Sequence, residues 1–158
     1  MSTLNFVITK KEIYNRIFAT SAYTTRAREA IGTPPGVSGN MLLTADEKRI
    51  IDPLIENSIN EIFSFIVCYH PGTSIDYSTD DNDGAYMFNI KTPANYPAGN
   101  EGKLAKSIES YVANRTLQDW YTCMKPDEAS LVAAKTQNDI TTLQSLLTQR
   151  EKPQIMEE

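Results

Sequence analysis

A run of acidic and amide side chains ending on a glycine, residues 78–84 (STDDNDG), is the densest group of potential metal ligands in the chain. A calcium-binding EF-hand loop needs oxygen ligands at its first, third and fifth positions, glycine at the sixth and a bidentate glutamate at the twelfth. With Gly84 at the sixth position, Thr79 falls on the first and Ile90 on the twelfth. The strongest ligand is therefore missing, and we expect no metal site here.

The residues on either side of this run alternate between apolar and polar types. Ile75 and Tyr77 precede it with Asp76 between them, and Tyr86, Phe88 and Ile90 follow it, alternating with Met87 and Asn89. A period of two indicates strands, and an Asp-Gly pair accepts the positive φ of a tight turn. The pattern predicts a β-hairpin at about 74–91 with a solvated acidic tip. Such a tip could hold a stray cation or contact a partner through Asp80, Asp81 and Asp83.

The residue types that most often catalyse reactions are sparse. The chain has one histidine, His70, and two cysteines, Cys68 and Cys123, without a CxxC spacing, so a zinc site lacks ligands. It has no G-x-S-x-G, Walker, H-E-x-x-H or G-x-G-x-x-G motif. Carboxylates on an exposed hairpin tip would keep ordinary pKa values and gain little as general acids or bases. We expect no catalytic residue, no cofactor and no metal, two free and partly buried thiols, and His70 as a capping or surface group.

Charge is distributed unevenly along the chain. The whole chain carries −5, but residues 1–30 contain five basic and two acidic side chains, which gives +3 there and −8 in the remainder. A basic first helix could meet the acidic flank of an identical neighbour in head-to-tail association. It could also touch nucleic acid, although no Arg/Lys stripe with interleaved aromatic residues follows, or it could simply be solvated. The basic candidates for interaction are Lys10, Lys11, Arg16, Arg26 and Arg28.

Helical spacing of apolar residues predicts four helices. The first begins after Thr9, which forms a capping box with Glu12, and runs to about residue 30 before TPPG at 33–36. The second begins after a capping box of Thr44 and Glu47 and runs to residue 67, with Pro53 either kinking it or marking a restart capped by Asp52.

The third and fourth helices follow the hairpin. The third begins after Asn100 as its cap and carries Trp120 among its expected core residues. The fourth begins at Pro126 and ends near Arg150. With a short strand over residues 4–8, the sequence predicts an α-dominated α+β fold, a four-helix body with an inserted hairpin.

The domain organisation follows from this pattern. We expect a single helical domain over residues 1–152 and a flexible C-terminal tail over 153–158. The longest apolar run, residues 62–69, is too short to span a bilayer, and the chain shows no secretion signal. We therefore expect a soluble protein made in the cytoplasm, with no membrane partner.

Three stretches carry a family resemblance: ITKKEIYNRIFATSAYTT, LTADEKRIIDPLIENSINEIFSFI and SYVANRTLQDWYTCMKPDEASLVAAKTQNDITTLQSLLTQREKP. They resemble a family of small virion proteins of tailed phages that infect gut Bacteroidales, including crAss-like phages. The signals are the Trp120–Tyr121 pair, an acidic start to the last helix, and an Arg-x-Lys-Pro ending at Arg150 and Lys152. The chain differs from the family in Pro53 and in its long acidic hairpin.

The resemblance implies a structural, non-enzymatic protein: a head–tail connector or ring subunit in the phage neck or tail, stacked on the portal. Its partners would be identical subunits in a ring and the portal or other neck and tail proteins, with DNA passing through the channel. The implied location is the virion, after synthesis in the host cytoplasm. The alternative is a small non-enzymatic binding or regulatory protein, touching nucleic acid through the basic first helix.

Overall fold

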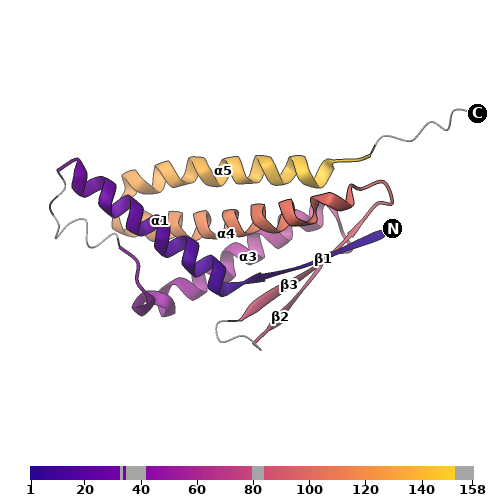
Figure 1. Cartoon of the computed structure of the whole chain (residues 1–158), viewed down its shortest axis with the longest axis horizontal. Helices are drawn as coiled ribbons and strands as arrows, with labels where there is room; N and C mark the ends of the chain where they lie inside the picture. The colour runs from indigo at the N-terminus through magenta and orange to yellow at the C-terminus, as the bar shows by residue number, and fades with distance from the viewer. Residues whose placement is uncertain (33, 35–41, 80–83, 152–158) are drawn as a thin grey trace, which may run out of the picture.

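The computed structural model describes residues 1–32, 34, 42–79 and 84–151. In this part of the chain, four α-helices and one small antiparallel sheet form an α-dominated α+β fold (Figure 1). The fold class expected from the sequence, a four-helix body with an inserted hairpin, is confirmed. The acidic hairpin tip and the tail expected over 153–158 lie outside the described residues.

Four long helices make up the body. α4 is the central element, because it contacts α1, α3, α5 and strand β1. α4 and α5 lie side by side and are joined by a single residue, Lys125 (Figure 1). Short 3₁₀ turns, η2 at Ala45–Glu47 and η3 at Ala98–Asn100, lead into α3 and α4. The helices are α1 at Lys10–Ala30, α3 at Lys48–Tyr69, α4 at Glu101–Met124 and α5 at Pro126–Thr148.

The helix starts follow from local hydrogen bonding. At the start of α1, the Thr9 hydroxyl accepts the backbone N–H of Glu12 at 3.3 Å. Before η2, the backbone N–H of Thr44 donates to Glu47 Oε2 at 2.7 Å and the Thr44 hydroxyl donates to the same atom at 2.6 Å. These bonds lower the pKa of Glu47. The bonds to the backbone N–H groups of Glu12 and Thr44 satisfy donors that a first helical turn leaves unpaired. Thr9 is therefore confirmed as the N-cap of α1, and the capping box of Thr44 and Glu47 is confirmed before η2.

A three-stranded antiparallel sheet in the order β1-β3-β2 packs against the helices. β1 spans Ser2–Thr9, β2 spans Ser74–Ser78 and β3 spans Ala85–Thr92. The predicted hairpin is therefore confirmed as β2 and β3, and Gly84 takes the expected positive φ, +89°. The pairing of β1 with β3, from Ser2 opposite Thr92 to Thr9 opposite Ala85, was not predicted.

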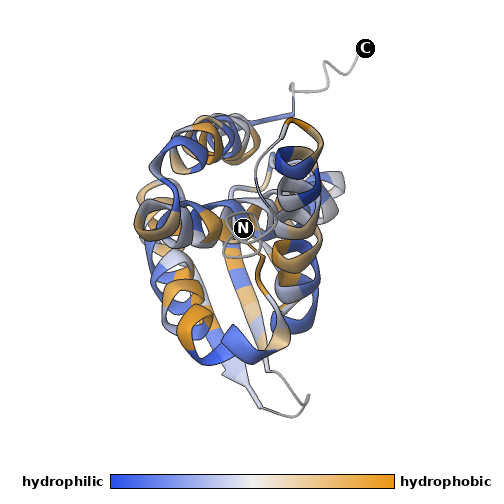
Figure 2. Cartoon of the chain, turned by 90° about the vertical axis from the view of Figure 1, so that its left-hand side faces the viewer, coloured by the Kyte–Doolittle hydropathy of each residue, from blue (hydrophilic) through white to orange (hydrophobic). Residues whose placement is uncertain are grey.

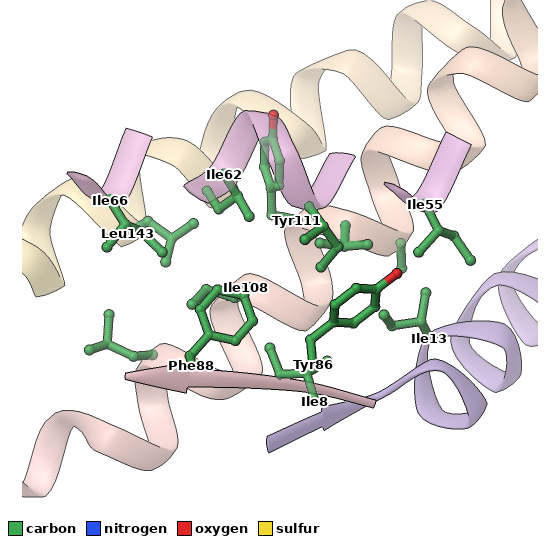
Figure 3. Close-up of a cluster of buried hydrophobic side chains, with 14 of the residues drawn as sticks. Ile8, Ile13, Ile55, Ile62, Ile66, Tyr86, Phe88, Ile108, Tyr111 and Leu143 are labelled. Atoms are coloured by element: carbon green, nitrogen blue, oxygen red, sulfur yellow. The ribbon is translucent and has the colours of Figure 1, made fainter. Parts of the chain in front are cut away.

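The core lies between the inner face of the sheet and the helices. Figure 3 shows Ile8 and Phe88 from the sheet pointing toward Ile62 of α3 and Ile108 of α4, all almost fully buried. The helices carry hydrophobic and hydrophilic residues on different sides (Figure 2). Burying aliphatic and aromatic side chains of this size stabilises a fold by about 1.5–3 kcal/mol each, so this layer holds sheet and helices together.

Two sequence interpretations of helix starts need correction. α3 continues through Pro53 from Lys48 to Tyr69, so Asp52 does not cap a restart. Asp52 instead accepts a hydrogen bond from the Tyr14 hydroxyl of α1. Asn100 does precede α4, but its side-chain amide donates to Gln149 Oε1 at 2.6 Å and makes no capping bond. In both cases a contact between distant segments replaces the local one.

Burial also differs from expectation at several side chains. His70 is the C-cap residue of α3, as one of the two expectations had it, but with 2 % of its surface exposed it is not a surface group. Cys68 and Cys123 are free but exposed, although we expected them to be partly buried. Trp120 packs against the core as a partly buried side chain, whereas its neighbour Tyr121 is fully buried. These differences depend on which helix faces are covered, which spacing alone does not show.

Candidate interaction surfaces

Lys10 is buried at the junction of β1 and α1 (6 % exposed). Its Nζ lies 3.0 Å from Glu56 Oε1 of α3, and it lies over the rings of Tyr77 and Tyr86 at 5.2 and 5.9 Å from their centroids. Tyr86 donates its hydroxyl hydrogen to Glu56. We call Lys10, Glu56, Tyr77 and Tyr86 the Lys10 cluster. Lys10, which the sequence analysis named as a candidate for interaction, is therefore buried and paired with Glu56 within the chain.

The protonation states of the Lys10 cluster suit a structural role. Burial alone would lower the pKa of Lys10, but the hydrogen bond and charge of Glu56 outweigh it and the pKa is raised. Burial, followed by the hydrogen bond to Glu56, raises the pKa of the Tyr86 phenol. Efficient proton transfer needs a pKa near the working pH. Both groups therefore keep their protons near pH 7 and contribute a fixed charge and a fixed donor.

Two further basic residues of α1 have intramolecular partners. Arg16 Nε lies 3.2 Å from Glu109 Oε1 of α4. Arg28 forms an ion pair with Glu128 in the first turn of α5, and that glutamate is buried. With Lys10, three of the five basic residues singled out in the first helix hold α1 to the rest of the body.

The remaining sequence candidates lie in different places. Lys11 and Arg26 are exposed on α1. Arg150 follows α5 and donates from Nη1 to the carbonyls of Leu147 at 3.2 Å and Gln149 at 2.6 Å. These three residues do not follow one another on a single element. Lys11 lies at the start of α1, Arg26 near its end, and Arg150 after the end of α5. Asp80, Asp81, Asp83 and Lys152 lie outside the described residues.

An ion-pair network that the sequence did not reveal joins α3 to α4. Arg115 Nε and Nη2 lie 2.9 and 3.2 Å from the two carboxylate oxygens of Glu61, and Arg115 also pairs with Asp119. Tyr111 donates to Glu61 at 3.0 Å. The hydrogen bond to Arg115 is the main cause that lowers the pKa of Glu61, and burial with Glu61 raises the pKa of Tyr111 to about 12. These groups too are fixed in their ordinary charge states.

The outer strands of the sheet offer backbone groups for pairing. In the described part of the chain, β1 and β2 pair only with β3, so each leaves one edge without a strand. The amide of Lys10 donates to Gly84 across the β1–β3 pair at 3.0 Å. By strand alternation, the amides of Thr3, Asn5 and Val7 then point to the free edge. The sequence predicted a strand here but could not show which of its edges stays unpaired.

The outer face of the sheet carries an apolar pair. Val7 of β1 and Met87 of β3 are opposite each other in the register, and they are 54 % and 39 % exposed. Their neighbour across β2 is Asp76, which is also exposed. Scattered exposed apolar residues are ordinary on protein surfaces, but this pair lies directly beside the free edge of β1.

A pocket of about 360 Å³ opens beside His70, where the turn after α3 meets the end of β3. Its walls are mainly apolar and include Tyr69, Pro71 and Pro93. His70 closes the inner side: its Nε2–H donates to the Leu147 carbonyl at 3.0 Å, and its ring meets the Tyr96 ring edge-on. Burial lowers the pKa of His70, so the neutral imidazole is favoured. Sequence reasoning missed this pocket, because its walls come from turns that are distant along the chain.

The described residues lack two further features. They contain no cluster of three or more histidine, cysteine or acidic side chains arranged to hold a metal ion. None of their helices combines the length and the apolar character needed to cross a membrane.

The chain was also compared with known proteins. No protein-family model, curated protein or solved structure matches it.

Proposed function

We propose that the protein is a structural subunit of a phage virion, a connector or ring protein of the neck or tail that joins the portal-bearing head to the tail. The resemblance of three helical regions to small virion proteins supports the phage context. The architecture supports an assembly role, because a body of four packed helices presents a sheet with unpaired edges to its surroundings.

The free edge of β1 is the observation that carries this proposal. The strand is eight residues long, and Ser2–Thr9 contains no proline and no charged side chain. Proteins that stay monomeric usually protect such an edge with charges, prolines, bulges or a covering element. Among the described residues no strand pairs with this edge, and an edge without a partner strand can accept one from another chain through backbone hydrogen bonds. Val7 and Met87 would add apolar contact at the same place.

Charge supports the assembly role in a secondary way. The exposed cations of α1 are Lys11 and Arg26, whereas Lys10, Arg16 and Arg28 are paired within the chain. Exposed rim charges mainly set association rate and salt sensitivity. The internal pairing also reduces the charge that α1 could offer to phosphates, which weighs against the alternative of a nucleic-acid-binding regulator.

The protonation states favour a binding role over acid–base catalysis. Lys10, Tyr86 and Tyr111 have raised pKa values and Glu61 has a lowered one, so each stays in its resting charge state near pH 7. Each of these groups already has a partner within the chain. We therefore propose that the protein is not an enzyme.

The first experiment is mass spectrometry of purified virions alongside infected-cell extract. We expect the protein in virions at several copies per particle, together with the portal. If it is abundant in cells and absent from virions, the proposed function is wrong.

The second experiment tests the edge of β1. Asn5→Pro removes an amide that points to the free edge, and Asn5→Thr is the matched control that keeps it. We expect both variants to fold, and only the proline variant to reduce the number of tailed particles counted by electron microscopy. Normal particle numbers with Asn5→Pro would show that the edge of β1 is not an interface, whatever the protein's location.

A further inference from the structure

We propose that the free edge of β2 binds an extended segment of another protein, with an arginine side chain of that segment in the pocket between β2 and α3. The inference concerns the opposite border of the sheet from β1, so it goes beyond the proposed function and stands without it. It rests on backbone groups of β2 that face no partner strand, on a pocket at the same border, and on two carboxylates beside them.

The backbone of β2 offers groups for pairing. In the described part of the chain, β2 pairs only with β3 (Figure 1). The even-numbered residues of β3 make the hydrogen bonds to β1, so its odd-numbered residues bond to β2. Asp76 lies opposite Met87 and therefore bonds to β3, which leaves the backbone groups of Ile75 and Tyr77 pointing to the free edge. An extended segment can pair with these groups as a further strand.

A pocket of about 240 Å³ opens at this edge, and we call it the β2 pocket. Its volume is below the roughly 300–1,000 Å³ of small-molecule pockets, so it suits one side chain. Ile75 and Tyr77 lie opposite the buried Phe88 and Tyr86, so their side chains are on the inner face of the sheet. Every second side chain of a strand added at this edge would point to the same face. The walls include Glu56, Ile59, Asn60 and Phe63 of α3 and Ile75 and Tyr77 of β2.

The β2 pocket combines apolar walls with a carboxylate. Ile59 is buried, and Phe63 is half-buried. Glu56 Oε1 is the oxygen that meets both Lys10 and the Tyr86 hydroxyl, while 47 % of the Glu56 side chain stays exposed. An apolar side chain placed over this carboxylate would remove its water without replacing the hydrogen bonds. A guanidinium would replace that water with charge-assisted hydrogen bonds.

An arginine matches the remaining walls as well. Its aliphatic stem can pack against Ile59 and Phe63 while its head stays at the border of the pocket. A planar guanidinium also stacks on aromatic faces, and the Tyr77 ring is half exposed here. Its five donors are enough for Glu56 together with the side-chain carbonyl of Asn60.

Charge at the edge favours a basic partner over a second copy of this chain. Asp76 is exposed on the outer face of β2, and Glu56 lies on the inner side of the same edge. Two β2 strands paired with each other would bring the Asp76 carboxylates of both copies close together, which is unfavourable. A segment with a cation is attracted by the same carboxylates, so the edge discriminates between the two partners.

Titration with a designed peptide tests the proposal. Acetyl-TVTRTVT-amide carries its arginine and both valines on one face and reads the same in either direction, so both strand orientations present the same side chains. We expect saturable shifts of the backbone amide resonances of Ile75 and Tyr77, measured by nuclear magnetic resonance. The matched peptides replace the arginine by citrulline, which keeps its shape without its charge, or by leucine. We expect each to bind about tenfold more weakly, equivalent to about 1.4 kcal/mol.

A pair of protein variants tests the location of the site. Asn60→Arg places the chain's own guanidinium at the β2 pocket and should weaken binding of the arginine peptide about tenfold. Asn138→Arg makes the same change at an exposed position of α5 and should leave binding unchanged. Both asparagines are exposed, so we expect both variants to fold. Equal binding by the two variants would show that the β2 pocket is not the site.

The peptides give further outcomes that overturn the proposal. Equal binding of the citrulline peptide would show that charge is not recognised, and equal or tighter binding of the leucine peptide would show that the pocket takes an apolar side chain. Shifts confined to Thr3, Asn5 and Val7 would place the peptide on β1 instead. Absence of saturable shifts at millimolar peptide would show that the edge of β2 does not bind such a strand. The presence of the protein in virions is measured separately, so either proposal can fail alone.

Discussion

The Lys10 cluster and the pocket beside His70 lie at opposite ends of β3 and differ in whether their groups are paired within the chain. At the Lys10 cluster, a buried ammonium has a carboxylate 3.0 Å away and two aromatic rings around it, so its charge is fully used within the chain. At the pocket, His70 is satisfied by the Leu147 carbonyl, and the walls in front of it are apolar and open.

This difference shows that conspicuous charge is a poor guide to a binding surface. Lys10, Arg16 and Arg28 stand out in the sequence, yet the structure pairs each with a glutamate on another helix. The pocket is built from prolines, a glycine turn and aliphatic stems, which attract no attention in a sequence. The pocket and the free edge of β1 are places where apolar atoms or backbone groups stay uncovered.

The largest expected effect tests whether the Lys10 cluster depends on its charge pair. Glu56→Gln keeps the shape of the side chain and an acceptor for Tyr86 but leaves the Lys10 ammonium without its carboxylate. Removing one partner of a buried ion pair costs about 3–5 kcal/mol. Because Glu56 is half exposed, we expect a smaller loss of about 2 kcal/mol in the free energy of unfolding, measured with urea.

A double variant separates charge from packing at this cluster. Lys10→Met together with Glu56→Gln removes both charges, and replacement of a buried pair by apolar groups is often neutral. We expect it to recover most of the stability that Glu56→Gln alone loses. The control Glu12→Gln changes an exposed glutamate of α1 and should stay within about 0.5 kcal/mol of the wild type. Equal losses in the single and double variants would mean that packing, not charge, matters here.

The same glycine-to-alanine change should have unequal effects in the two regions. Gly84, beside the Lys10 cluster, has φ +89°, and a Cβ there would lie 2.2 Å from the Tyr77 hydroxyl oxygen. Strain and displacement of Tyr77 should cost about 2 kcal/mol. At Gly72, beside the pocket, the added Cβ would lie 2.7 Å from Lys91 Cδ and 3.0 Å from Lys91 Cβ, but without a positive φ. Since the outer part of the Lys91 side chain can move, we expect a smaller loss of about 1 kcal/mol. Thermal unfolding of both variants checks the contrast, and a larger loss at Gly72 would contradict it.

The smallest expected effect is a pH dependence from His70. Burial lowers its pKa below the ordinary 6.5, so the unfolded chain binds a proton more readily than the folded one. Stability is then complete above about pH 6.5 and falls on acidification until the lowered pKa is passed. The loss is at most about 1.4 kcal/mol for each unit of pKa difference. Urea unfolding at pH 7.0 and 5.5 should show this loss in the wild type and not in His70→Gln, and equal losses in both would refute it.

Much of the fold was accessible from the sequence because its signals are local. Capping at Thr9 and Thr44 depends on residues three positions apart, and both caps formed as expected. Alternation and an Asp-Gly pair defined the hairpin, and Pro126 marked the first residue of α5. The class of fold followed from adding these elements together.

The candidate interaction surfaces required the tertiary structure. Whether Lys10 faces solvent depends on where Glu56 lies, 46 positions along the chain, and whether His70 is buried depends on Leu147 at the end of α5. The free edge of β1 exists only because β3 takes the other edge. Local sequence decides which hydrogen bonds a segment can make with itself. The burial of a charge, the opening of a pocket and the exposure of a strand edge depend on contacts between segments that are distant in sequence. The spacing of residues along the chain does not determine those contacts.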